Sequence, residues 1–207
     1  MRAAALAAAL PALLGCATTG RLAPGGPAGE PYDDALAHWT ASGQVHSRTD
    51  FVDRVVDLWA TFQSEAFREA RVHRWAELAG LAPSEVENLL AQEHAEGQAE
   101  LDFFAALEVS PSHDNDLANV HSVWHVTLET SDGRVVSPIA IRLFDPPNVN
   151  QRKLYPYVRD FWNGYWIRFP AIDATGKPLV AEGTTSVTLH LGSALGQVDL
   201  TYAVHGS

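Results

Sequence analysis

Residues 120–204 alternate between apolar and polar side chains, and this alternation predicts β-strands. On the first strand, alternate residues share one face: Ser122, Trp124, Val126 and Leu128. Asp132-Gly133 then provides a hairpin turn. A second alternating run follows, formed by Ile139, Ile141 and Leu143. We therefore expect two antiparallel strands that pair through this turn and share one mostly apolar face.

Three more strands are predicted in the same half of the chain, at 165–170, 185–191 and 197–204. The last two are expected to pair across residues 192–196 and to bury alternate side chains. These are Val187, Leu189 and Leu191 on one strand, and Val198, Leu200, Tyr202 and Val204 on the other. Short strands separated by turn signals predict an antiparallel β-sandwich, of which the immunoglobulin-like fold is one form.

The earlier part of the chain has apolar residues at spacings of three and four, which is typical of amphipathic helices. One helix is expected to begin at Thr49-Asp50 and to end at Gly80. Its apolar stripe is Val52, Val55, Trp59, Phe62, Ala66 and Ala70. A second helix should begin at Pro83, with the stripe Val86, Leu89, Leu90, Gly97, Leu101 and Phe104. Two helices joined by a few residues usually lie antiparallel, so a helical hairpin is predicted.

The predicted fold is therefore α+β, with an N-terminal helical hairpin packed on a C-terminal antiparallel β-sandwich. We expect a signal peptide at 1–15, a flexible tether at 16–31, a helical region at 32–109 and a β-sandwich region at 117–207. The helical region should also contain a short helix around Leu36 and Trp39. Residues 17–31 are rich in Ala, Gly and Pro and have no apolar period, which favours a tether.

Residues 1–16 have the pattern of an export signal: one basic residue, an Ala/Leu run too short to span a bilayer, and the ending Leu13-Leu14-Gly15-Cys16. This ending resembles the lipobox of bacterial lipoproteins, which implies that Cys16 is acylated and becomes the mature N-terminus. Three acyl chains would anchor the protein in the bilayer effectively permanently. Cys16 is the single cysteine of the chain, so intramolecular disulfides are excluded. The alternative is an ordinary secretory signal with a chance cysteine.

The chain is acidic, with 14 basic and 25 acidic residues and a net charge of −11. Loss of Arg2 with the signal would make the mature charge −12. Nucleic acids and anionic lipid surfaces bind basic proteins, so neither is expected as a partner through charge. The position after Cys16 is Ala17, whereas in lipoprotein sorting an Asp there favours the inner membrane. We therefore expect the outer membrane, with the protein facing the periplasm.

Two groups of residues suggest binding chemistry. Nine histidines in an acidic exported chain suggest metal binding, and the best candidate cluster is His113, Asp114, Asp116 and His121. A solvated loop and strand face is the competing interpretation. An aromatic-rich stretch at 155–169 provides candidate ligand-binding residues, Tyr157, Trp162 and Trp166, because ring faces can stack on sugars or peptides. The same rings can equally pack in the core.

Glu93 falls on the apolar stripe of the second helix, between Leu90 and Gly97. An ionised carboxylate in that position needs a partner such as His73 or an arginine. It is either a buried acid of a functional site or one half of an inter-helix pair. The sequence has no Gly-rich phosphate loop, GxSxG elbow, HExxH motif or zinc-type cysteine pair, so no catalytic residue is assigned.

From Phe103 onward, the segments FFAALEVS, NVHSVWHVTLETSDG and LYPYVRDFWNGYWIRFP resemble uncharacterised bacterial lipoproteins of the myxobacterial type. In these, a segment ending in Phe-Phe precedes a Trp-bearing strand, an Asp-Gly turn and a tyrosine-proline stretch. The resemblance covers roughly a third of the chain plus the lipobox, and it gives a role to Cys16 alone.

These features predict a non-enzymatic envelope lipoprotein that is held by Cys16 in the bilayer and binds an envelope protein partner. No cofactor is expected. The alternatives are a periplasmic module that binds a ligand, glycan or metal, and a periplasmic hydrolase with an unrecognised motif.

Overall fold

The computed structural model describes residues 31–46, 54–144 and 149–204. The predicted signal peptide, Cys16, nearly all of the tether and the predicted helix start at Thr49-Asp50 lie outside these ranges. The described helices are α1 (Tyr32–Trp39), α2 (Glu65–Ala79), α3 (Pro83–Ala99) and α4 (Val149–Leu154), with a short 3-10 turn, η1, at Ser112–Asp114. No helix in this part of the chain is long and apolar enough to cross a membrane.

Nine strands form two antiparallel sheets among the described residues. Sheet 1 has the order β1-β2-β3-β7-β6, and its strands are β1 (Thr40–His46), β2 (Arg54–Phe62), β3 (Glu100–Val109), β7 (Asn163–Pro170) and β6 (Ala140–Phe144). Sheet 2 has the order β5-β4-β8-β9, and its strands are β5 (Val135–Val136), β4 (His125–Thr130), β8 (Ser186–Ser193) and β9 (Gly196–Ala203). The α+β class is confirmed, and the two sheets are consistent with the predicted β-sandwich.

The facing sides of the two sheets form one apolar core. Sheet 1 contributes alternate residues of its central strands, such as Leu58 of β2 and Phe103 of β3, and sheet 2 contributes Leu128, Leu189 and Leu200. The seven inward residues predicted for the last two strands are all buried, and these strands pair from Ser193↔Gly196 to Ser186↔Ala203, as expected. The hydrophobic effect of this core is the main force that holds the sheets together.

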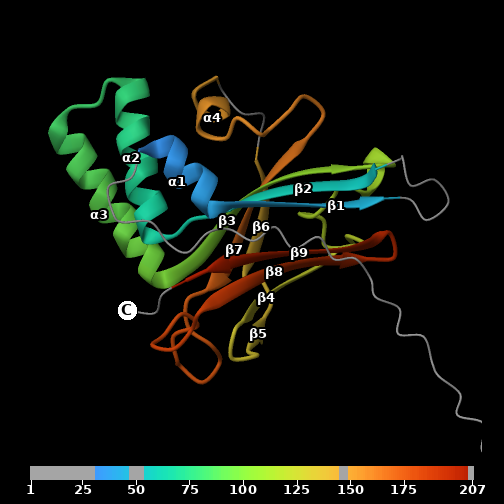
Figure 1. Cartoon of the computed structure of the whole chain (residues 1–207). Coiled ribbons are helices and arrows are strands. Elements are labelled where there is room, and N and C mark those ends of the chain that lie inside the picture. Colours follow the sequence, from blue (N-terminus) through green and yellow to red (C-terminus); the bar gives the residue numbers. More distant parts are fainter. Residues whose placement is uncertain (1–30, 47–53, 145–148, 205–207) are drawn as a thin grey trace, which may run out of the picture.

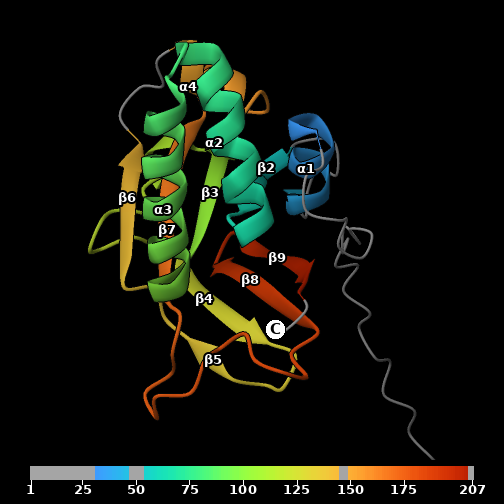
Figure 2. The ribbon, with the colours of Figure 1, turned by 90° about the vertical axis from the view of Figure 1, so that its left-hand side faces the viewer.

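The helices lie on the side of sheet 1 that faces away from sheet 2 (Figures 1 and 2). A second apolar cluster fills this interface, with Phe67 from α2, Phe104 from β3, and Leu154 and Tyr155 at the end of α4. The molecule therefore has three layers: helices, sheet 1 and sheet 2. Sheet 1 is the middle layer, and its central strand β3 is buried on both faces.

The helix ends follow their sequence signals. The Ser64 hydroxyl accepts a hydrogen bond from the Phe67 amide at the start of α2, and Gly80 ends α2 with a left-handed φ of 67°. Pro83 occupies the first turn of α3, where the Glu85 carboxylate accepts a hydrogen bond from the Ala82 amide. The predicted helix end at Gly80 and helix start at Pro83 are both confirmed.

The first predicted helix was too long, because residues 54–62 form strand β2. Val56, Leu58, Ala60 and Phe62 are buried on its inner face at a period of two. The outer face of β2 is also covered, so β2 carries apolar residues on both of its faces. Some of these, such as Val55 and Trp59, fall at the spacing of a helix by coincidence. For the same reason Leu101 and Phe104, which were assigned to the second helix, belong to β3. Strands β1, β2 and β3 all lie within residues 32–109, which were expected to be helical.

The predicted pairing of the strand before Asp132-Gly133 with the strand after Pro138 was also wrong. After the turn, β4 pairs with β5, which has only two residues. The chain then crosses at Ser137-Pro138 to sheet 1, where β6 pairs with β7. The strand predicted around Trp124 begins at His125, although Trp124 itself is buried as expected.

Candidate functional site

The outer face of sheet 1 carries a buried ion-pair network at its contact with α2 and α3. Arg68 of α2 is 3% exposed. Its Nε donates to the carbonyl of Gln63 at 3.0 Å, one terminal nitrogen donates to Glu93 of α3 at 2.8 Å, and the other donates to Asp102 of β3 at 2.8 Å. Three elements therefore meet at one guanidinium, whose planar donors suit bidentate and fork-like pairing.

Arg71, one turn further along α2, extends this network. Its guanidinium donates to the same Glu93 oxygen at 2.5 Å and lies 5.8 Å from the centre of the Trp166 ring. Burial alone would lower the pKa of Arg71, but the interaction with the Tyr155 hydroxyl and the ion pair with Glu93 raise the pKa above its ordinary value. The arginine partner expected for Glu93 is thus present twice. Arg68, Arg71, Glu93 and Asp102 together carry two positive and two negative charges, so the network is balanced.

A pocket of about 210 Å³ opens beside Arg71. Its lining combines the Arg71–Glu93 pair with apolar side chains from α2, α3 and α4: Val72, Trp75, Leu89 and Leu154. The Nε atom of Arg71 is buried and has no hydrogen-bond partner in the part of the chain that the structure describes. The pocket therefore offers one ion pair and otherwise apolar walls, which suits a small, mostly apolar ligand.

The candidate aromatic residues pack in or beside the core. Tyr157 stacks on Trp59 at 5.7 Å, and its hydroxyl makes a 2.7 Å hydrogen bond with Thr61 and donates to the Phe104 carbonyl at 3.2 Å. Trp166 meets Phe104 edge to face at 5.2 Å. Trp162 is 8% exposed and lies under the guanidinium of Arg159. Tyr157 and Trp166 thus share the cluster around Phe104, while Trp162 lies outside this cluster.

Tyr155 is the centre of the same cluster. Its ring stacks on Phe104 with centroids 3.9 Å apart, and its hydroxyl donates to the Gln63 side chain at 3.2 Å. Burial raises the pKa of Tyr155 to about 12. The phenol is therefore neutral at physiological pH and acts as a hydrogen-bond donor rather than as an acid or nucleophile.

The four residues of the predicted metal cluster do not converge on one point. His113 lies 3.4 Å from Asp114, Asp116 accepts a hydrogen bond from the Ser122 hydroxyl at 2.8 Å, and His121 is exposed. Within the described ranges, no group of three or more His, Cys, Asp or Glu side chains is placed to hold a metal ion.

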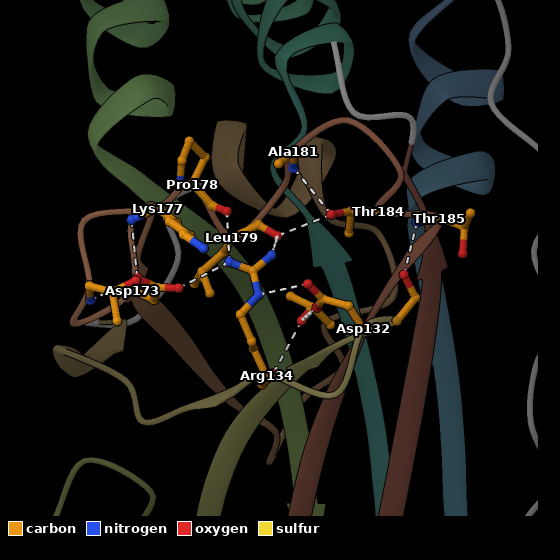
Figure 3. Close-up of polar contacts among 12 residues, drawn as sticks. Asp132, Arg134, Asp173, Lys177, Pro178, Leu179, Ala181, Thr184 and Thr185 are labelled. Atoms are coloured by element: carbon orange, nitrogen blue, oxygen red, sulfur yellow. Dashed lines mark hydrogen bonds and ion pairs between the residues drawn. The ribbon is translucent and has the colours of Figure 1, made fainter.

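Another arginine, Arg134, organises a separate polar cluster (Figure 3). Its guanidinium donates to Asp132 at 2.8 Å, to Asp173 at 3.2 Å, and to the carbonyls of Pro178 and Leu179 at 2.8 and 3.0 Å. These contacts fold residues 171–185 against the β4–β5 turn. Because the donors are occupied by the chain itself, we assign this cluster a structural role.

Strand β6 has a different kind of surface. It pairs with β7 on one side only and is therefore an edge of sheet 1 within the described chain. Ile139 and Leu143 are 57% and 56% exposed, and Ile141 between them is half-buried. The core-side face of the other edge strand, β1, is covered by β9, since a Cβ atom on Gly43 would lie 2.5 Å from Val198 Cγ1. We call Ile139, Ile141, Arg142 and Leu143, with the backbone that carries them, the β6 edge.

Sequence reasoning found Glu93 but missed Arg68, Asp102 and the Arg134 cluster. Asp102 had a signal, because it stands directly before the apolar run Phe103–Leu107, where a carboxylate requires a partner. Arg68 had no such signal in the sequence. It lies outside the apolar stripe assigned to its helix, so it resembled a residue of the solvated face. The β6 edge was missed because its alternating residues were assigned to a covered strand.

Comparison with known proteins gives no family. No protein-family model matches the chain, and no curated protein matches it. A crystal structure of a protein of unknown function from Burkholderia pseudomallei is similar at a TM-score of 0.41 and 13% identity, over 82% of this chain and 82% of that chain. A likeness of this degree carries no argument about function.

Proposed function

We propose that the protein is a non-enzymatic envelope lipoprotein that is anchored through Cys16 and binds an envelope protein through the β6 edge. The anchor rests on the lipobox-like ending Leu13-Leu14-Gly15-Cys16 and on Cys16 being the single cysteine. We place it in the outer membrane, facing the periplasm, because Ala17 follows Cys16. The immunoglobulin-like form of the sandwich stays a prediction and plays no part in this proposal.

The observation that carries the interaction is the uncovered β6 edge. Ile139 and Leu143 expose more than half of their surface, although they lie on the face of sheet 1 that is otherwise buried in the core. Natural proteins usually protect such an edge by a charge, a bulge or a covering segment, because exposed backbone and apolar side chains pair with other chains. On β6 the charge is Arg142, which lies on the outward face, so the apolar row on the core side stays open. An edge left uncovered is therefore a typical interaction site.

Site-specific photo-crosslinking in intact cells tests this function. A photo-reactive amino acid in place of Leu143 should give a covalent adduct with one envelope protein. The matched control places the same amino acid at Gln197, an exposed residue on the opposite edge strand of sheet 2. The Cys16→Ser variant should lose both membrane attachment and the adduct. Equal adducts from positions 143 and 197, or none from position 143, would contradict the proposal.

A second candidate function is binding of a small ligand in the pocket beside Arg71. It is favoured by the Arg71–Glu93 ion pair in the pocket lining and by the apolar walls of Trp75 and Leu154. A thermal-melt screen tests it, because a ligand at a hundred times its dissociation constant adds about 2.7 kcal/mol to the free energy of unfolding. A ligand of this pocket should lose its effect in the Trp75→Ala variant, whereas Trp162→Ala, on a residue outside the pocket lining, is the control.

A further inference from the structure

The β6 edge has features that define the chemistry of its partner. We propose that it binds an extended segment of a partner protein, which adds to sheet 1 as a further strand and places a carboxylate beside Arg142. This inference rests on the proposed function and specifies the partner of the same surface.

The backbone of β6 sets the conformation of the partner. Residues 140–144 pair with residues 164–168 of β7, and on the other side their peptide groups have no strand neighbour in the described chain. In a strand, alternate amide and carbonyl groups point to the same side, so a free edge offers a regular row of donors and acceptors. An extended segment satisfies this row, whereas a helix does not.

The side chains of β6 set the residues that the partner segment needs on one face. Ile141 lies opposite Ile167 and Leu143 lies opposite Tyr165, and both β7 residues are buried in the core. Ile139, Ile141 and Leu143 therefore point to the core side of sheet 1. A partner strand that continues the sheet would place every second side chain next to this row, so those side chains should be apolar.

Arg142 determines which residue the partner segment needs on its outward face. It is exposed, lies opposite Trp166, and makes no ion pair or side-chain hydrogen bond within the described residues. A carboxylate on the outward face of the added strand would pair with its guanidinium. The body of the protein carries a strong net negative charge, so we expect this acidic residue within an otherwise apolar or neutral segment.

A second copy of this chain fits the β6 edge less well. Residues 137–144 contain no acidic residue. An antiparallel pair centred on Ile141 would place Arg142 opposite Ala140 of the other copy. A pair centred on Arg142 would place two like charges opposite each other, which is destabilising. Neither register supplies a carboxylate to Arg142, so a different protein is the better partner.

Synthetic peptides test the inference with the full chain extracted from membranes in mild detergent. The probe is a blocked seven-residue peptide with valine at alternate positions, aspartate at the central outward position and threonine elsewhere. Binding is measured by fluorescence anisotropy, and protection of the amides of residues 139–144 by hydrogen exchange. Two further probes are N-methylated, one on the odd and one on the even peptide nitrogens. Strand addition requires that one of these binds and that the other does not, because only alternate amides face β6.

Two variants test the side-chain contacts. Leu143→Lys should weaken binding at least about tenfold, because it removes apolar contact and adds a charge to the apolar row that the bound peptide would cover. Its matched control is Val149→Lys, an equally drastic change at an exposed position on α4. Arg142→Glu should weaken binding of the aspartate peptide about tenfold and should favour the same peptide with lysine in place of aspartate.

Several results would overturn the inference: no binding up to about 1 mM peptide, equal binding of both N-methylated probes, or no exchange of charge preference in Arg142→Glu. A dimer that sediments in the absence of peptide and is lost in Leu143→Lys would assign the edge to a second copy instead. A photo-crosslinked partner at position 143 together with failed peptide tests would leave the proposed function standing and reject strand addition alone.

Discussion

The two faces of sheet 1 are covered in different ways. The inner face meets sheet 2 through aliphatic and aromatic side chains such as Leu58 and Phe103. The outer face meets the helices through a mixture of rings and ion pairs, with Phe104 beside Asp102 and Arg68. The inner contact depends on area and packing, whereas the outer contact also depends on geometry, because each buried charge must keep its partner. The contact with the helical layer should therefore be the more sensitive of the two to removal of a single charged side chain.

Adjacent phenylalanines on β3 compare the two faces directly. Phe103 is 0% and Phe104 is 1% exposed, and they point to opposite sides of the sheet. Phe103→Ala should lower the free energy of unfolding by about 3–5 kcal/mol, and Phe104→Ala by a similar amount, because both leave a cavity in a packed core. Denaturant unfolding measures both. A much smaller loss for Phe104→Ala would mean that the helices cover the outer face only loosely.

Arg68 tests the role of charge on the outer face. Arg68→Ala should cost about 3–5 kcal/mol, because it leaves the buried Asp102 and the partly buried Glu93 without their shared partner. The double variant Arg68→Met, Asp102→Leu removes both charges and should recover part of the loss. Thermal and denaturant unfolding check both variants. A double variant that is no more stable than Arg68→Ala would show that packing, and not the orphaned charge, sets the cost.

Glycines test how tightly the inner face is packed. At Gly43 of β1 a Cβ atom would meet Val198 Cγ1 at 2.5 Å, whereas at Gly192 of β8 nothing lies within 4 Å. Gly43→Ala should therefore destabilise the protein by about 1–3 kcal/mol through overpacking. Gly192→Ala is the matched control and should have little effect. Equal stability of the two variants would mean that β1 and β9 can move apart without cost.

The Arg134 cluster adds a pH-dependent contribution at the rim of sheet 2, away from both covered faces. The Thr175 hydroxyl, then the Lys177 amide and Arg134, lower the pKa of Asp173 below its usual value. A carboxylate whose pKa is lower in the folded state stabilises the fold above its unfolded pKa of about 3.9, and this contribution is lost as the pH falls through the folded pKa.

Thr175→Val should therefore be less stable than the wild type at pH 7, and the difference should shrink as the pH falls below about 4. Urea unfolding at a series of pH values measures this. The control is Thr185→Val, whose exposed residue lies on the other side of Arg134 from Asp173 in Figure 3 and whose difference from the wild type should not depend on pH. A pH-independent difference for Thr175→Val would remove Asp173 from the acid sensitivity of the protein.

The sequence predicted the strands that are covered on one face better than those covered on both. In β8 and β9, buried residues such as Leu189 and Leu200 alternate with polar ones, so both position and facing were correct. In β2 and β3, each face is buried against a different layer, so residues 103–107 read as a continuous apolar run without a period. Long-range pairing decides such segments, and a single sequence does not contain it.

The candidate site was predictable to a lesser extent. Glu93 required a partner wherever it was buried, so an ion pair could be inferred before Arg68 and Arg71 were located. The β6 edge could not be inferred, because exposure of Ile139 and Leu143 depends on β5 having only two residues and on the crossing at Pro138. Alternation shows that a strand has an apolar face, but only the assembled sheets show whether another layer covers that face.

The position of α1 determines the direction in which a pulling force would cross sheet 1. The predicted tether enters the fold at Tyr32, whose hydroxyl donates to the Leu154 carbonyl, and α1 continues directly into β1, the edge strand farthest in sheet order from β6. In the proposed arrangement, tension between a membrane anchor and a partner on β6 would act across the five strands of sheet 1 rather than along them. Force in that direction separates strand pairs one after another, so the protein should unfold under force in steps. The helices that pack on the central strands should make those strands the last to separate.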